Sequence, residues 1–227
     1  MNPLRPLALA LCLICGGVTG LDRAQTQPSL MQLQDAAQQG VAEAQYQLGL
    51  RFHGGNGVLQ SFADAAEWFG LAAEQGHSAA QNRLAQYLFE GLGVAQDLDT
   101  ALAWFDRAAQ AGDAQYLFEY ASALETRPDG RADPVLASQI YQQAADLGHL
   151  DAQVSLGVMY QNGVGVEKDL DRARSLYEGP AEAGYARAQN NLGLMYVRGE
   201  GVQQDYERAV QLFKLAAEQG LPVAMTN

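Results

Sequence analysis

The sequence predicts an all-α fold, a solenoid of five 36-residue helical hairpins, and three observations support it. The 227-residue chain repeats with a period of 36 residues and without gaps between the copies. Within each copy, apolar residues recur at spacings of three and four, which is typical of a helix with one buried face. Glycine pairs interrupt this pattern at fixed places, where a helix can end because glycine adopts positive φ readily. Tandem units of this kind stack around one continuous core.

The composition fits a folded protein and excludes some classes of partner. Apolar residues make up 48% of the chain and charged residues 18%, which argues against intrinsic disorder. Asp and Glu number 26 against 14 Lys and Arg, so the formal net charge is -12. This acidic excess repels phosphate backbones and anionic membrane surfaces. We therefore expect no nucleic acid as a partner.

The first element is an apolar N-terminal segment. Arg5 precedes an apolar run over residues 7–18, and the small residues Thr19 and Gly20 follow. This order is typical of a secretory signal, so we predict a signal peptide at residues 1–20. The run is short for a membrane span, and we expect no membrane insertion after cleavage. The predicted localisation is periplasmic or secreted.

Both cysteines of the chain, Cys12 and Cys15, lie in this segment. Two alternatives to cleavage stay open: a retained membrane anchor, and lipid attachment at a cysteine. The bulky residues Leu11 and Ile14, which precede the cysteines, fit a lipidation signal poorly. A chain cut after Gly20 keeps no cysteine, which excludes disulfides and thiolate metal sites.

Short segments flank the repeats. We predict a flexible lead-in at residues 21–29 and an N-terminal capping helix at 30–40, where Leu33 and Ala37 occupy the positions of repeat residues. Residues 221–227 form a tail that begins another first helix and is too short to complete it.

Five repeats occupy the chain between these segments. Their predicted bounds are 41–76, 77–112, 113–148, 149–184 and 185–220. The first helix of most repeats carries a leucine followed by a small residue, as in Leu48-Gly49 and Leu84-Ala85. The small residue lets the second helix approach closely. A G-x-G-V turn, residues 55–58 in the first repeat, then ends the helix.

The second helix of each repeat begins at a capping residue such as Asp97 or Asp169. Asp133-Pro134 is the strongest start, because proline suits the first position of a helix. We expect this helix to bury Trp68, Trp104 and one aromatic residue per repeat. The aromatic residues are Phe69, Phe105, Tyr141, Tyr177 and Phe213.

Two repeats depart from the pattern. The third has Tyr120-Ala121 for Leu-Gly and replaces the G-x-G-V turn with residues 127–130. The fourth has Gly179-Pro180 inside its second helix, where proline is expected to bend or break the helix. Both changes could be drift in surface turns, or they could alter the curvature near a binding surface.

These motifs resemble the Sel1-like repeat family, which is related to tetratricopeptide repeat proteins, although the latter have a 34-residue unit. The fourth repeat shows the first half of the family pattern in Ala152, Leu156, Gly157, Tyr160, Gly163, Gly165, Val166 and Asp169. The second repeat shows the other half in Ala101, Trp104, Phe105, Ala108, Ala109 and Gly112. The resemblance implies a right-handed α/α solenoid and an adaptor or scaffold function. Cysteine-rich members, which carry a disulfide in each repeat, have been assigned β-lactamase activity, and the repeats here contain no cysteine.

The sequence offers no catalytic residues, cofactor site or metal site, so we predict that the protein is not an enzyme. His77 and His149 are two repeats apart, too far to share a metal ion, and we expect both to be exposed turn residues. No nucleophile elbow, phosphate-binding loop or metalloprotease helix is present. Acidic pairs such as Asp97 and Asp99 straddle helix starts, where capping explains them.

The resemblance places the first helices on the concave face, which predicts a partner-binding groove. The predicted groove residues are Tyr46, Leu50, Asn82, Gln86, Phe89, Phe118, Val154, Val158, Asn190 and Leu194. Apolar side chains with polar neighbours are typical of binding surfaces. We expect the groove to bind an extended peptide or a helix of an envelope protein, with basic partner residues at the contact rim. The alternatives are a structural subunit of an envelope machine and a β-lactam or peptidoglycan hydrolase.

Overall fold

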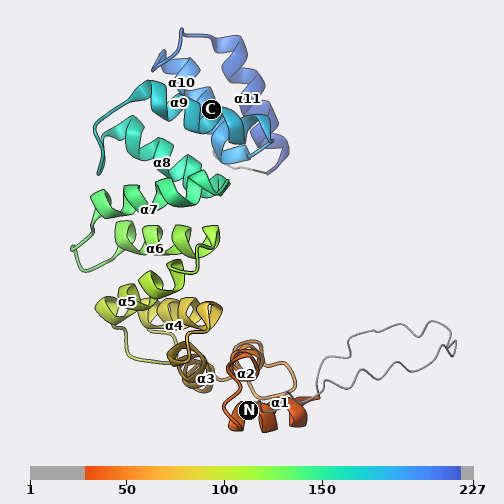
Figure 1. Ribbon diagram of the computed structural model, residues 1–227. Helices are drawn as coiled ribbons and strands as arrows, with labels where there is room; N and C mark the ends of the chain where they lie inside the picture. The colour runs from red at the N-terminus through yellow and green to blue at the C-terminus, as the bar shows by residue number, and fades with distance from the viewer. Residues whose placement is uncertain (1–28, 221–227) are drawn as a thin grey trace, which may run out of the picture.

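The computed structural model describes residues 29–220 and contains helices and turns only in that range (Figure 1). The predicted signal peptide, most of the lead-in and the tail at 221–227 lie outside the described residues. The eleven described helices are α1 (Leu30–Gln38), α2 (Ala42–Gly54), α3 (Phe62–Glu74), α4 (Ser78–Glu90), α5 (Leu98–Ala109), α6 (Ala114–Thr126), α7 (Pro134–Asp146), α8 (Leu150–Asn162), α9 (Leu170–Glu182), α10 (Ala186–Arg198) and α11 (Tyr206–Glu218).

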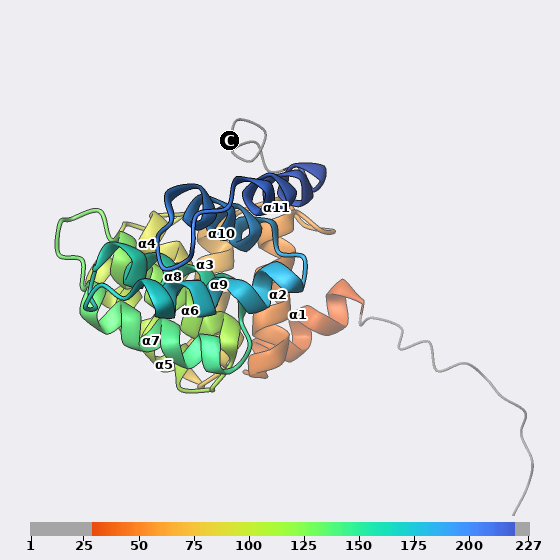
Figure 2. The ribbon, with the colours of Figure 1, turned by 90° about the horizontal axis from the view of Figure 1, so that it is seen from above.

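The helices form five hairpins, α2–α3 to α10–α11, that follow one another from α1 at one end to α11 at the other (Figure 1). Each helix packs mainly against the helices that precede and follow it in the chain. Seen along the stack, successive hairpins turn about a common axis (Figure 2). This arrangement confirms the predicted all-α solenoid.

The turn and cap residues lie where the repeat pattern predicts them. Four first helices end at a glycine with φ between 66° and 71°, namely Gly55, Gly91, Gly163 and Gly199. Each second helix begins after a capping side chain that accepts a backbone hydrogen bond, from Ser61, Asp97, Asp133, Asp169 or Asp205. Pro134 is the first residue of α7, as predicted.

The small residue after the leucine column sets the distance between the helices of a hairpin. A Cβ atom on Gly157 would lie 2.5 Å from Cε1 of Tyr177, and one on Gly49 would lie 2.6 Å from the ring of Phe69. Both rings are fully buried. The predicted close approach of the second helix is therefore confirmed.

Pro180 does not break the helix, because α9 continues through this residue to Glu182. The proline ring is buried where other repeats have an alanine such as Ala144. Its carbonyl accepts a hydrogen bond from the backbone N–H of Tyr185 at 2.8 Å, as the Ala144 carbonyl does from His149. The helix end is thus the same as in the neighbouring repeat.

A column of glutamines, which the sequence reasoning missed, joins consecutive repeats. The Nε2 atoms of Gln45, Gln81, Gln153 and Gln189 donate to backbone carbonyls at the end of the preceding helix, at 3.1–3.2 Å. This helix is α1 for Gln45 and the second helix of the previous repeat for the others. Each of these carbonyls also accepts the backbone N–H of the closing glycine, so the glutamine amide is a second donor that links the helix end to the next repeat. The third repeat has Leu117 in this column.

Candidate protein-binding face

The structure divides the predicted groove residues into two groups. Tyr46, Leu50, Gln86, Phe89, Phe118, Val158 and Leu194 are partly exposed. Val154, Asn82 and Asn190 are only 0%, 4% and 6% exposed, so the expectation of accessible positions is corrected for these three. Their column faces the next repeat, and Val154 packs in the same core cluster as Tyr177 and Met195.

The two aromatic members of that column, which are partly exposed, stack on histidines of the next repeat. The rings of Tyr46 and His77 are 4.7 Å apart at an interplanar angle of 28°, and those of Phe118 and His149 are 4.6 Å apart at 15°. The same joint therefore occurs twice, two repeats apart. It closes the spaces between repeats one and two and between repeats three and four.

Both histidines are partly buried N-caps, which corrects the prediction of exposed turn residues. Nδ1 of His77 accepts the backbone N–H of Ala80 at 3.2 Å, and Nδ1 of His149 accepts that of Ala152 at the same distance. This bond places the ring proton of a neutral imidazole on Nε2. Nε2 of His77 then donates to Glu43 at 3.0 Å, and this contact lowers the pKa of the Glu43 carboxyl.

Three of the five core aromatic rings contact a side chain near the end of the first helix of their own hairpin. The hydroxyl groups of Tyr141 and Tyr177 donate to Glu125 at 2.9 Å and to Gln161 at 3.1 Å. Phe105 instead packs edge-on against Phe89, with ring centroids 6.3 Å apart. Burial, together with the charge of Glu125, raises the pKa of Tyr141, so its hydroxyl stays protonated and can donate.

A hollow of about 210 Å³ lies between α4 and α6, on the face of the first helices. It is lined by Gln86, Phe89, Glu90, Phe105, Phe118, Glu119, Ser122, Ala123 and Thr126. Three of these residues, Gln86, Phe89 and Phe118, belong to the predicted groove. The hollow thus combines aromatic walls with two carboxylates.

One of these carboxylates, Glu119, is held by amide groups. Its Oε2 accepts from Nδ2 of Asn82 at 2.6 Å and from Nε2 of Gln86, and its Oε1 accepts from Nε2 of Gln115 at 2.7 Å. Gln115 in turn contacts Nε2 of His149 at 3.0 Å. The network therefore spans three repeats along one face.

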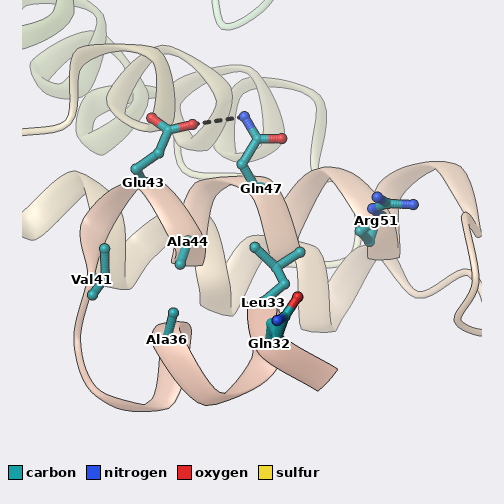
Figure 3. Close-up of a pocket in the computed structure, with 8 residues that line it drawn as sticks. All are labelled: Gln32, Leu33, Ala36, Val41, Glu43, Ala44, Gln47 and Arg51. Carbon is teal, nitrogen blue, oxygen red and sulfur yellow. Dashed lines mark hydrogen bonds between the residues drawn. The ribbon is translucent and has the colours of Figure 1, made fainter. Parts of the chain in front are cut away.

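A second hollow, of about 430 Å³, lies between α1 and α2 at the N-terminal end of the stack (Figure 3). Leu33, Ala36 and Ala44 line its apolar part, and Glu43 and Gln47 form a hydrogen-bonded pair on its rim. It corresponds to the place where Tyr46 packs one repeat later. Within residues 29–220 no helix precedes α1, so no side chain equivalent to Tyr46 fills this hollow.

The divergent turn of the third repeat contains an ion cluster. The Arg127 guanidinium bonds Asp129 through Nε at 2.7 Å and Asp99 through Nη2 at 2.9 Å. Arg131 also pairs with both carboxylates, at 2.7 Å and 3.1 Å. The arginines lower the pKa values of Asp129 and Asp99.

The described residues show no metal-binding or membrane-spanning arrangement. Residues 29–220 contain no group of three or more histidine, cysteine or acidic side chains placed to share a metal ion. None of the helices in this range combines the length and the apolar character needed to cross a bilayer.

The repeats also match a known family. Five successive segments, 42–77, 78–113, 114–149, 150–185 and 186–221, match the Sel1 repeat. The chain belongs to the Sel1 repeat family. Each Sel1 repeat begins one residue later than the bounds predicted from the closing glycines. Proteins built from Sel1 repeats generally serve as scaffolds for protein–protein interactions, and the solved relatives are mostly repeat scaffolds without enzymatic activity.

Solved structures of other Sel1 repeat proteins are similar to this one. A protective antigen of uropathogenic Escherichia coli strains is 36% identical with a TM-score of 0.77; the match covers 86% of this chain and 42% of the antigen. A Sel1 repeat protein from Oxalobacter formigenes is 30% identical with a TM-score of 0.75, covering 84% and 75%. One from Klebsiella pneumoniae is 26% identical with a TM-score of 0.51, covering 86% and 95%. The comparison with curated proteins finds no similar sequence.

Proposed function

We propose that this Sel1 repeat protein is an exported scaffold that binds an extended peptide or a helix of an envelope protein along its first helices. The hollow between α4 and α6 is the observation that carries the proposal. It exposes parts of Phe89 and Phe118 beside polar side chains, a combination that is typical of the anchoring site of an interface. Export is inferred from the apolar N-terminal segment.

The partly exposed apolar residues Leu50, Val158 and Leu194 extend this face beyond the hollow. They lie in one column of the repeat, on α2, α8 and α10. A segment that follows the face can therefore contact several repeats in turn. Binding would add together many modest contacts around the central hollow.

The test is capture of a partner from the native envelope fraction with tagged full-length protein. Replacing both Phe89 and Phe118 with Ser should abolish capture, because it removes the aromatic walls. Phe89 also packs on the buried Phe105, so this variant loses stability, and its circular dichroism must show that it is folded.

A second variant blocks the hollow and leaves the core intact. Thr126 is exposed and lines the hollow, so Thr126→Arg places a long side chain across it. The matched control is Asn162→Arg, at the equivalent exposed position of α8. We expect capture to be lost with Thr126→Arg and kept with Asn162→Arg. Equal capture by both would contradict binding at this face.

The acidic balance of the chain makes a further part of the proposal testable. A partner with basic residues at the rim should bind more weakly as the salt concentration rises, because salt screens charges at exposed contacts. Affinity measured over a salt series checks this expectation. A flat response would remove the basic rim from the proposal and leave the apolar contact in place.

A further inference from the structure

We infer that the hollow between α4 and α6 binds one basic side chain of the partner, an arginine or a lysine. The aliphatic stem lies between Phe89 and Phe118, and the cationic group lies at the carboxylate of Glu119. This inference rests on the proposed function and names the chemistry of its anchor residue.

The aromatic walls are held in place by their own neighbours. Phe89 packs edge-on against Phe105 with centroids 6.3 Å apart, and Phe118 lies between Tyr141, at 5.8 Å, and His149, at 4.6 Å. Walls fixed in this way lose little conformational freedom on binding. Phenyl rings suit both the methylene stem and the positive charge of a basic side chain.

The charge of the hollow is negative, and no ion pair among the described residues neutralises it. Glu90 and Glu119 both line it, and neither takes part in the ion pairs formed among residues 29–220. Arg83, on the same helix as Glu90, donates to Oε1 of Gln86 at 3.1 Å instead. A cation in the hollow would therefore gain two carboxylates without displacing an existing partner.

The remaining hydrogen-bonding capacity of the network consists of acceptors. Glu119 accepts three amide hydrogen bonds, whereas a carboxylate offers about four acceptor positions. Asn82 is 4% exposed, and its Oδ1 is buried without a partner among the described residues. Its amino group must face Glu119, because a carboxylate only accepts. The network therefore matches a group that only donates, as guanidinium and ammonium groups do.

The experiment selects binders from a random dodecapeptide library on the full-length protein. Peptides that bind wild type and the Asn162→Arg protein, and fail to bind Thr126→Arg, are sequenced and synthesised. The selected peptides should share one Arg or Lys next to apolar residues. Replacing an arginine with neutral citrulline, or a lysine with norleucine, should weaken binding by about tenfold or more.

A double-mutant cycle then assigns the contact to Glu119. The change Glu119→Gln should weaken binding of the basic peptide by about tenfold and leave binding of the neutral peptide nearly unchanged. The change Glu74→Gln, which removes the same charge from an exposed residue of α3, is the control and should have little effect on either peptide.

The outcomes separate this inference from the proposed function. Hollow-dependent peptides without a shared basic residue, or with additive effects of Glu119→Gln and the neutral replacement, would overturn the basic anchor and leave the scaffold function standing. A library that yields no hollow-dependent peptide would contradict both proposals.

Discussion

At the scale of single residues, the second glycine of the G-x-G-V turn determines how closely adjacent repeats approach. A Cβ atom on Gly201 would lie 2.8 Å from the carbonyl oxygen of Leu170, and one on Gly165 would overlap the carbonyl group of Pro134. In each case the turn lies against the start of the second helix of the previous repeat. These glycines are therefore required both by their positive φ and by a backbone contact.

A pair of alanine substitutions separates these two requirements. Gly165 and Gly148 have φ of 70° and 86°, but a Cβ atom on Gly148 would meet nothing within 4 Å. We expect Gly148→Ala to cost about 1 kcal/mol of unfolding free energy through backbone strain alone. Gly165→Ala should cost roughly 3 to 5 kcal/mol, because overlap is added to strain. Urea denaturation of both variants checks this, and equal losses would contradict the role of the backbone contact.

Residue identity alone was informative for glycines and caps, and less so for the glutamine column. Gly55 predicts a turn and Asp97 predicts a helix start, because few other residues suit those conformations. Gln81, in contrast, is buried because its amide bonds the Ala73 carbonyl of the previous repeat. Its recurrence at 36-residue intervals was visible in the sequence, but a recurring polar residue is equally consistent with an exposed face.

At the scale of elements, the third turn shows how a repeat joins its neighbour without the G-x-G-V motif. Asp129 occupies the column of Gly165 and Gly201, and a side chain at that position prevents the close backbone contact. The carboxylate instead joins Arg127 and Arg131, which also bind Asp99 at the start of α5. An ion cluster therefore takes the place of a backbone contact at this joint.

The cluster predicts a pH-dependent contribution to stability. The pKa of Asp129 is lowered mainly by its hydrogen bonds to Arg127, so its contribution is present above the ordinary aspartate pKa of about 3.9 and is lost as the pH falls through the lower folded value. Asp129→Asn should therefore lower the melting temperature at pH 7 and have a diminishing effect below about pH 4. Melting curves from pH 7 to pH 2 check this, and a difference that persists in acid would contradict it.

The order of helices and turns was predictable because the same pattern occurs five times in the sequence. The continuation of the helix through Pro180 was not predictable. A single proline favours a break, whereas the surrounding repeat pattern favours a helix. In the structure the helix continues, and the proline ring occupies a buried position that is alanine in the other repeats. The histidine caps were missed for a related reason: His77 and His149 follow a closing glycine, which suggests an exposed turn.

At the scale of the whole molecule, helices contact mainly their neighbours in the chain, so stability depends on how many neighbours a repeat has. A central helix such as α6 is covered on both sides, whereas α1 and α11 are covered on one side among the described residues. This is the condition under which a repeat protein frays from its ends.

Hydrogen exchange measures this directly. Backbone amides of α1 and α11 should exchange at least about tenfold faster than those of α6 and α8 under native conditions, because opening an end breaks a single interface. Mass spectrometry of exchanged peptides gives the rates for each helix. Uniform protection along the chain would indicate one cooperative unit and contradict the expectation.

The sequence predicted only in part which residues of the proposed binding face are exposed, because exposure depends on how the repeats stack. Of the residues that the sequence predicted for the groove, Gln86, Phe89 and Phe118 line the hollow between α4 and α6. The prediction also included Val154, because the columns that point to the groove and to the next repeat are adjacent on the helix. Only the relative placement of neighbouring repeats shows which side chains are covered.

The sequential pattern of contacts also bears on how such a protein can change over generations. Because each described hairpin packs mainly against the hairpins before and after it, duplication or deletion of one 36-residue unit would change the packing mainly where that unit meets its neighbours. The match to the uropathogenic antigen covers 42% of that longer protein. Recombination at the closing glycines would therefore lengthen or shorten the proposed binding face in steps of one repeat.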